Sequence, residues 1–110
     1  MDLHIDERED GPGITVLTVQ GSIDLESRPR LLDAGRLALR REGAVGLVLE
    51  LADVGFVDSS GIGAFVDLAR QAEDSDLSFA IRDPSPRVLR VLQVTGLAHL
   101  WTGSTPAADA

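Results

Sequence analysis

The residues best suited to chemistry lie in one short segment, 58–63, which reads Asp-Ser-Ser-Gly-Ile-Gly. It joins a predicted strand to a predicted helix, where unpaired backbone N–H groups and the positive end of the helix dipole favour an anion. A serine hydroxyl can cap such a helix, and a phosphate on that serine would meet the same donors. The two glycines leave room for the backbone of another protein or a nucleotide to approach. Taken alone, the segment fits helix capping better than a phosphate or nucleotide site.

Two enzymatic interpretations of this segment fail on the surrounding residues. A serine hydrolase using Ser59 or Ser60 would need the flanks Gly-x-Ser-x-Gly and a histidine motif tied to the serine. His4 and His99 instead stand alone near opposite ends of the chain, which also leaves a metal site without ligands. The Gly-x-Gly pair lacks the third glycine of a dinucleotide fingerprint.

Composition excludes several further classes of enzyme. Without cysteine there is no thiol nucleophile, disulfide or cysteine metal site, and without lysine there is no Schiff base or P-loop. All ten basic residues are arginines; Arg36, Arg40 and Arg41 indicate a solvated helix face, with a partner contact as the alternative. The net charge of −8 disfavours nonspecific binding to nucleic acid and to anionic membranes. Much of enzyme chemistry is thereby excluded, and we expect a protein that has no cofactor and binds neither nucleic acid nor membrane.

The sequence shows neither a candidate membrane-spanning helix nor a secretory signal. No apolar run approaches the ~20 residues that a membrane helix needs, and residues 1–4 have no basic region leading into an apolar stretch. We therefore expect a cytoplasmic protein.

The pattern of apolar residues predicts one α/β domain over residues 1–101, followed by a flexible tail over 102–110. Strands are predicted over 3–9, 14–20, 46–51, 77–81 and 97–101, and helices over about 27–41, 60–72 and 86–94. The first two strands form an antiparallel hairpin. Asp24 or Ser27 is the expected cap of the first helix, and a loop through Gly55 and Phe56 leads to the second.

The alternation of strands and helices predicts sequential βα units and a mostly parallel sheet. Doubly wound sheets are buried on both faces, whereas these strands carry threonines, Glu50 and Ser78. We therefore predict that the helices lie mainly on one face and cover Leu49 and Phe79, with Glu50 and Ser78 on the other. On this view Glu50→Gln is nearly silent.

Four short motifs follow one another at the ends of the predicted elements. They are Gly-Ser-Ile-Asp at 21–24, Phe-Val-Asp-Ser-Ser-Gly-Ile-Gly at 56–63, Ser-Pro-Arg at 85–87 and Thr-Gly-Leu at 95–97. In order and spacing they resemble the STAS domain, specifically the stand-alone bacterial anti-sigma factor antagonists. The resemblance spans about residues 3–101 and implies a single STAS-like domain. Its specific part is Asp-Ser-Ser-Gly in its Phe-Val frame.

The resemblance implies a switch protein that is not an enzyme. In that family the dephosphorylated antagonist binds an anti-sigma factor, a serine kinase of the histidine-kinase ATPase fold, and so frees a sigma factor. The kinase phosphorylates the first serine of the motif, which corresponds to Ser59, and a PP2C-type phosphatase reverses this. The residues expected to bind the partner surround that serine: Asp24, Asp58, Ser60, Gly61 and Gly63. A monomer or weak dimer is expected.

Local geometry also favours Ser59 over Ser60 as the phosphate acceptor. Ser59 is expected to lie before the helix with its hydroxyl outward, whereas Ser60 is expected to cap the N–H groups near Ile62 and Gly63. A second function stays open, that of a STAS scaffold subunit in a stressosome-like or lipid-transport complex. The serine at the acceptor position favours the switch.

Overall fold

The structure, a computed structural model, describes residues 2–100 and contains four strands and three α-helices. In chain order these are β1 (Leu3–Glu9), β2 (Ile14–Ile23), α1 (Arg28–Arg40), β3 (Gly46–Val57), α2 (Ser59–Asp74), β4 (Ser78–Arg82), α3 (Pro86–Val94) and the 3₁₀ turn η1 (Ala98–Leu100). The strands form one sheet in the order β1-β2-β3-β4, with β1 antiparallel to β2 and the other pairs parallel. The predicted α/β domain with an antiparallel N-terminal strand is confirmed.

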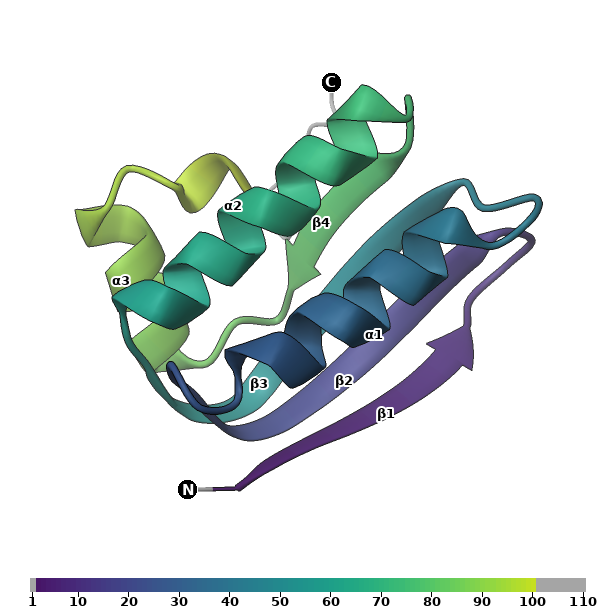
Figure 1. The fold of residues 1–110 in the computed structure, drawn as a ribbon. Coiled ribbons are helices and arrows are strands. Elements are labelled where there is room, and N and C mark those ends of the chain that lie inside the picture. The colour runs from purple at the N-terminus through teal and green to yellow at the C-terminus, as the bar shows by residue number, and fades with distance from the viewer. Residues whose placement is uncertain (1, 101–110) are drawn as a thin grey trace.

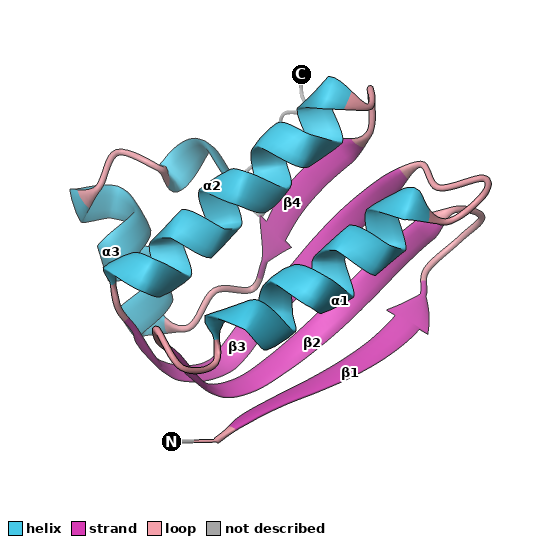
Figure 2. Ribbon diagram, in the orientation of Figure 1, coloured by secondary structure: helices cyan, strands magenta, loops and turns pink. Residues whose placement is uncertain are grey.

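Helices α1 and α2 lie side by side over one face of the sheet (Figure 1). Beneath them, β2, β3 and β4 contribute the fully buried side chains of Leu17, Leu49 and Ile81, which share one core with Phe65 of α2. Phe79 is half-buried and packs against this core. Figure 2 shows the same separation of a helical layer from a strand layer. The prediction that the helices lie mainly on one face is confirmed.

The two helices approach closely because of a glycine. A Cβ atom at Gly35 of α1 would lie 2.6 Å from a methyl carbon of Leu68 of α2, so a larger residue would force the helices apart. An ion pair of 2.7 Å between Arg28 and Asp67 joins the same two helices. Both apolar packing and an ion pair therefore join the two helices.

Strands β2 and β3 extend further than predicted, to Ile23 and Val57. β2 does not end at residue 20 as predicted. Gly21, with φ of +106°, stays in the strand, and an added Cβ there would lie 2.1 Å from the Asp2 carbonyl oxygen. Irregularities in the β2–β3 register mark this stretch. The predicted loop through Gly55 and Phe56 is wrong, because Phe56 pairs with Ser22 of the extended β2 and Gly55 lies within β3 at the register irregularity.

The second half of β3 lies beyond the end of β4 and is covered on that side by α3 (Figure 1). Ser85 makes the connection, since its backbone N–H donates to the Leu51 carbonyl at 3.0 Å and its hydroxyl donates to the Val54 carbonyl at 2.6 Å. The same hydroxyl accepts from the Val88 N–H at 3.2 Å and caps α3. Ser85 thus supplies hydrogen bonds to the part of β3 that β4 does not reach.

The predicted last strand over 97–101 is wrong. The Leu97 N–H donates to the Leu92 carbonyl at the end of α3, and the Leu100 N–H donates to the Leu97 carbonyl at 3.0 Å. These bonds close the backbone into η1 and bring Leu100 into the core. Trp101 and the tail 102–110 lie outside the described residues.

Candidate functional site

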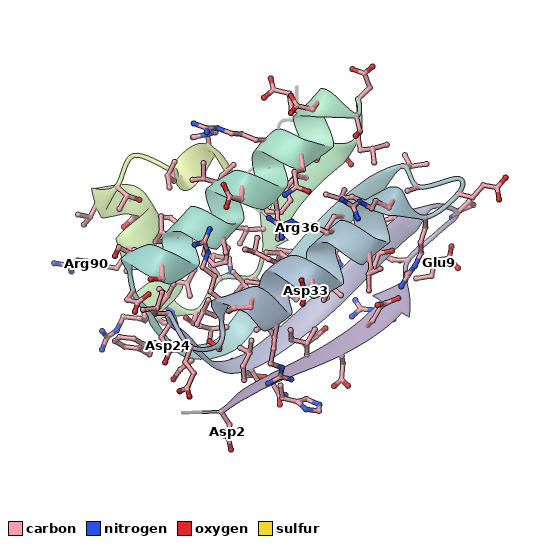
Figure 3. All side chains as sticks on the ribbon, viewed as in Figure 1. Asp2, Glu9, Asp24, Asp33, Arg36 and Arg90 are labelled. Atoms are coloured by element: carbon pink, nitrogen blue, oxygen red, sulfur yellow. The ribbon has the colours of Figure 1, made fainter. Side chains whose placement is uncertain are left out.

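Asp24 and Asp58 each follow the last residue of a strand, and the two strands are parallel neighbours. Ile23 and Val57 lie opposite each other in the β2–β3 register, and the Asp58 N–H donates to the Ile23 carbonyl at 3.2 Å. The start of α2 therefore lies at the same edge of the sheet as the turn that holds Asp24. Figure 3 shows Asp24 at this end of the molecule.

Asp58 is the N-cap residue of α2. Its Oδ1 accepts from the backbone N–H groups of Ser60 at 2.9 Å and Gly61 at 3.1 Å. The prediction that Ser60 caps the helix is wrong, because the carboxylate that precedes the helix already satisfies the first donors. For the same reason a phosphate would not meet a free set of donors here. It would meet a carboxylate that already occupies two of them.

The two serines of the motif differ in exposure. Ser59 is the first residue of α2, not the residue before it as predicted, and it is exposed. Ser60 is half-buried. Neither hydroxyl is hydrogen-bonded within residues 2–100. Ser59 therefore presents the more accessible nucleophilic oxygen.

Asp24 and Ser27 close a turn between β2 and α1. Asp24 Oδ1 accepts from the Ser27 N–H at 2.9 Å, and the Ser27 hydroxyl accepts from the Asp24 N–H at 3.0 Å. The hydrogen bond from the Ser27 backbone lowers the pKa of Asp24, so its charged form is favoured. Ser27 occupies the N-cap position without capping α1 by its side chain; its buried hydroxyl also lies 2.8 Å from the Ser22 carbonyl oxygen. Asp24 is thus half-exposed but fixed in orientation.

The two glycines of the motif have different roles. Gly61 is buried, and an added Cβ would lie 2.7 Å from side-chain carbons of both Ile23 and Val57. It allows α2 to begin directly against the ends of β2 and β3. At Gly63 an added Cβ would meet no atom outside its own helix within 4 Å, among the described residues. Only Gly63 thus leaves open space on the helix surface.

Leu25 is an exposed apolar residue at the same edge that the sequence analysis did not single out. It follows Asp24 directly and is 72% exposed. Its position in the turn, outside the buried stripe of α1, is the signal that could have revealed it. Leu25 therefore adds exposed apolar area beside the oriented carboxylate of Asp24.

The histidines do not contribute to this site. His4 Nε2 lies 3.3 Å from Asp6 on the exposed strand β1, and His99 is exposed in η1. Residues 2–100 contain no group of three or more His, Asp or Glu side chains arranged to hold a metal ion. In the same part of the chain no helix combines the length and apolarity needed to cross a membrane.

A mostly parallel sheet, helices mainly on one face and a serine motif opening the second helix define a STAS-type domain. The family model described as "Mlab, STAS domain" matches residues 8–102. The anti-sigma-B factor antagonist of Bacillus subtilis (strain 168) is 30% identical over 100 residues, which cover 91% of this chain and 89% of that protein. The chain therefore belongs to the STAS domain family, which confirms the resemblance.

Solved structures show the same fold. The anti-sigma factor antagonist SpoIIAA in its unphosphorylated form matches with a TM-score of 0.79 and 20% identity, over 94% of this chain and 90% of that one. The Bacillus cell fate determinant SpoIIAA in its phosphorylated form matches with a TM-score of 0.74 and 19% identity, over 94% of both chains. The single-domain α/β architecture is thus shared with both.

Proposed function

We propose that this protein is an anti-sigma factor antagonist that binds an anti-sigma factor serine kinase while Ser59 is unphosphorylated. Phosphorylation of Ser59 by that kinase ends the binding, and a PP2C-type phosphatase restores it. While the antagonist occupies the kinase, the sigma factor is free, which locates the protein in the cytoplasm with the transcription machinery. The observation that carries the proposal is the exposed Ser59 at the first position of α2, directly after the capping Asp58.

The position of Ser59 suits reversible modification. Its hydroxyl is exposed and makes no hydrogen bond within the described residues, so a kinase can reach it without unfolding the helix. A phosphate at the first turn gains about 0.3–1 kcal/mol from the helix dipole, and this gain offsets its repulsion from the Asp58 carboxylate. The fold should therefore survive the modification and remain a substrate for the phosphatase.

The same phosphate opposes binding to a partner. It adds a charge of about −1.5 to −2 next to the carboxylate of Asp58 and at the same sheet edge as Asp24. A partner that covers this edge would have to desolvate the phosphate beside a like charge. Leaving such a charge buried and unpaired costs about 2–5 kcal/mol, which lowers affinity by about 1.5–3.5 decades.

The proposed partner-binding surface combines Asp24, Leu25, Ser59 and Gly63. Asp24 is oriented by its turn and offers a charge, and Leu25 offers apolar area. Gly63 leaves space for close approach of the partner's backbone. Relatives named anti-sigma-B factor antagonists, at 30% identity over most of the chain, support this assignment.

The first test maps the phosphate. Each serine kinase of anti-sigma type encoded in the source genome is purified and incubated with the protein and Mg·ATP, and the product is fragmented for mass spectrometry. We expect phosphate on Ser59 in the wild type and in Ser60→Ala, and none in Ser59→Ala. Phosphate on Ser60 alone would overturn the choice of acceptor.

The second test measures binding by titration calorimetry with the same kinase. Unphosphorylated protein should bind, and the Ser59-phosphorylated form should bind about 1.5–3.5 decades more weakly. Asp24→Ala should fold, as shown by its melting curve, but bind poorly. Equal affinity of the two phosphorylation states would refute the switch and favour the scaffold function.

A further inference from the structure

The arginines of this acidic protein are concentrated on one helix. Residues 28–41 contain five of the ten arginines and a single acidic residue, Asp33, although the whole chain has a net charge of −8. This stretch is α1 together with its C-cap residue. We expect arginines concentrated in this way to bind acidic or hydrogen-bond-accepting groups, either within the chain or on another molecule.

Three of the five arginines make an ion pair or a hydrogen bond within the chain. Arg28 pairs with Asp67 of α2 at 2.7 Å, and Arg41 pairs with Glu7 of β1. Arg30 donates to the Leu3 carbonyl at 2.5 Å. Arg36 and Arg40, by contrast, make no hydrogen bond or ion pair within residues 2–100.

These two arginines belong to a four-residue surface, the α1 patch, which consists of Asp33, Arg36, Leu37 and Arg40. The four residues line one shallow hollow on the helix. Leu37 is 64% exposed, and Figure 3 shows Asp33 and Arg36 on α1 in the helical layer. Repulsion between Arg36 and Arg40 offsets the attraction between Asp33 and Arg36, and an exposed leucine gains nothing from the fold. The patch therefore contributes little to the stability of the monomer.

The spacing within the patch is that of a helix-pairing seam. Asp33 and Arg40 are seven residues apart, which is about two helical turns, so both lie on the same side of α1. Arg36 and Leu37 lie between them, one turn from each. The acidic end and the basic end of the seam are thus separated by Leu37 and the aliphatic stem and guanidinium group of Arg36.

We propose that the α1 patch pairs with the α1 patch of a second copy of this chain, with the two helices antiparallel about a twofold axis between residues 36 and 37. In this arrangement Asp33 faces Arg40 of the second copy, and the contact is repeated by symmetry. Leu37 packs on the aliphatic part of Arg36 of the second copy. A parallel pairing would place Asp33 against Asp33 and Arg40 against Arg40, and repulsion excludes it.

Self-pairing explains the patch better than an unrelated acidic partner does. A surface that binds an acidic protein needs only positive charge, whereas this patch holds one acidic group at the distance that matches its own arginine. One helix face buries less area than a standard stable interface. The dimer is accordingly weak, with a dissociation constant of about 10 µM to 1 mM.

Sedimentation equilibrium of the purified full chain, from about 10 µM to about 1 mM, tests the pairing. The wild type should shift from monomer toward dimer mass with increasing concentration. Asp33→Arg and Arg40→Asp should each stay monomeric, because each variant places like charges opposite one another. Arg70→Asp, which changes an exposed arginine on α2, is the matched control and should dimerise like the wild type.

Charge exchange makes the test specific for the antiparallel arrangement. A mixture of Asp33→Arg with Arg40→Asp should form a heterodimer, because opposite charges then face each other at both ends of the seam. The double variant Asp33→Arg/Arg40→Asp should regain the wild-type mass shift. A wild type that stays monomeric at every concentration, or single variants that dimerise as the wild type does, would overturn the proposal. Circular dichroism checks that every variant is folded.

Discussion

Arg8 of β1 and Glu50 of β3 form a bidentate ion pair across the strand that separates them. Arg8 Nη1 lies 3.1 Å from Glu50 Oε1, and Arg8 Nη2 lies 3.0 Å from Oε2. Thr18 of the intervening β2 donates to the same carboxylate at 3.0 Å, and Arg82 of β4 donates to it at 3.2 Å. One carboxylate thus links all four strands on the sheet face that α1 and α2 leave uncovered.

This network gives the protein an acid-sensitive element. The hydrogen bonds from Arg8, followed by that from Thr18, lower the pKa of Glu50 from 4.5 to about 2. A carboxyl group whose pKa is lowered by folding stabilises the fold above its unfolded pKa and loses that contribution as the pH falls through the folded pKa. The contribution of Glu50 should therefore be complete above about pH 4.5 and vanish near pH 2.

Glu50→Gln should destabilise the protein at pH 7, in contrast to the near-silent change expected from the sequence. The bidentate charge-assisted bonds are lost, but Arg8 is half exposed, so screening limits the loss to about 1 kcal/mol. Urea unfolding from about pH 7 down to about pH 2 measures it. The two proteins should converge in stability as the pH falls from 4.5 to about 2.

Asp53→Asn is the matched control, because Asp53 is an exposed carboxylate on the same strand. Its stability should follow that of the wild type over the whole pH range. A constant difference between wild type and Glu50→Gln over that range would show that the charge of Glu50 is not involved.

Leu49, the neighbour of Glu50 in β3, should carry a larger share of stability. It is fully buried beneath the helices, and truncation to alanine leaves a cavity in the core. Leu49→Ala should cost about 2–5 kcal/mol in chemical denaturation. Leu25→Ala, at 72% exposure, should cost less than about 0.5 kcal/mol. Equal losses for both variants would contradict the assignment of the core face.

The sequence predicted the elements well where local periodicity decides them. The helices over 28–40, 59–74 and 86–94 begin and end within a few residues of their predicted positions. The errors arose where tertiary contacts decide. Phe56 is a strand residue only because β2 continues past Gly21 to meet it, and 97–100 turn because the Leu97 N–H stays bonded to α3. Neither contact has a local signature.

The site shows the same division between local and long-range information. The family resemblance, carried by the motifs, was enough to select Ser59, Asp24 and Asp58 as residues of one surface. The choice between Asp58 and Ser60 as the cap was not decided by composition, because both residue types cap helices. The difference in surroundings between Gly61 and Gly63 could not be predicted, because Gly61 is packed against Ile23, which is distant in the sequence.

Gly61 and Gly63 should respond to alanine in opposite directions. Gly61→Ala places a methyl group against Ile23 and Val57, and should cost about 1–3 kcal/mol. Gly63→Ala has open space and improves helix propensity, so it should gain about 0.5–1 kcal/mol. Thermal melts of both variants measure the difference. If Gly63 lies in the proposed interface, the more stable variant should also bind the kinase less tightly, and unchanged affinity would place it outside.

The cap at Asp58 should account for part of the stability of α2. Asp58→Ala leaves the N–H groups of Ser60 and Gly61 without their acceptor and should cost about 0.5–2 kcal/mol. Asp58→Ser keeps a capping oxygen and should recover most of that loss. Unfolding in urea compares the three proteins. Equal losses for the two substitutions would show that capping is not what Asp58 contributes.

The effect of charge at Ser59 should depend on whether Asp58 is present. In the wild type, Ser59→Asp places a second carboxylate beside one that already accepts from the Ser60 and Gly61 N–H groups. Repulsion between them offsets the gain from the helix dipole, so the change in stability should be close to zero. In the Asp58→Ala background the repulsion is absent and the N-terminal donors are free, so Ser59→Asp should stabilise by about 0.3–1 kcal/mol.

A double-mutant cycle from urea unfolding at low ionic strength gives this coupling directly, with Ser59→Asn as the uncharged control. Identical effects of Ser59→Asp in both backgrounds would mean that the two positions are electrostatically independent. The repulsion proposed to end partner binding would then lack its basis.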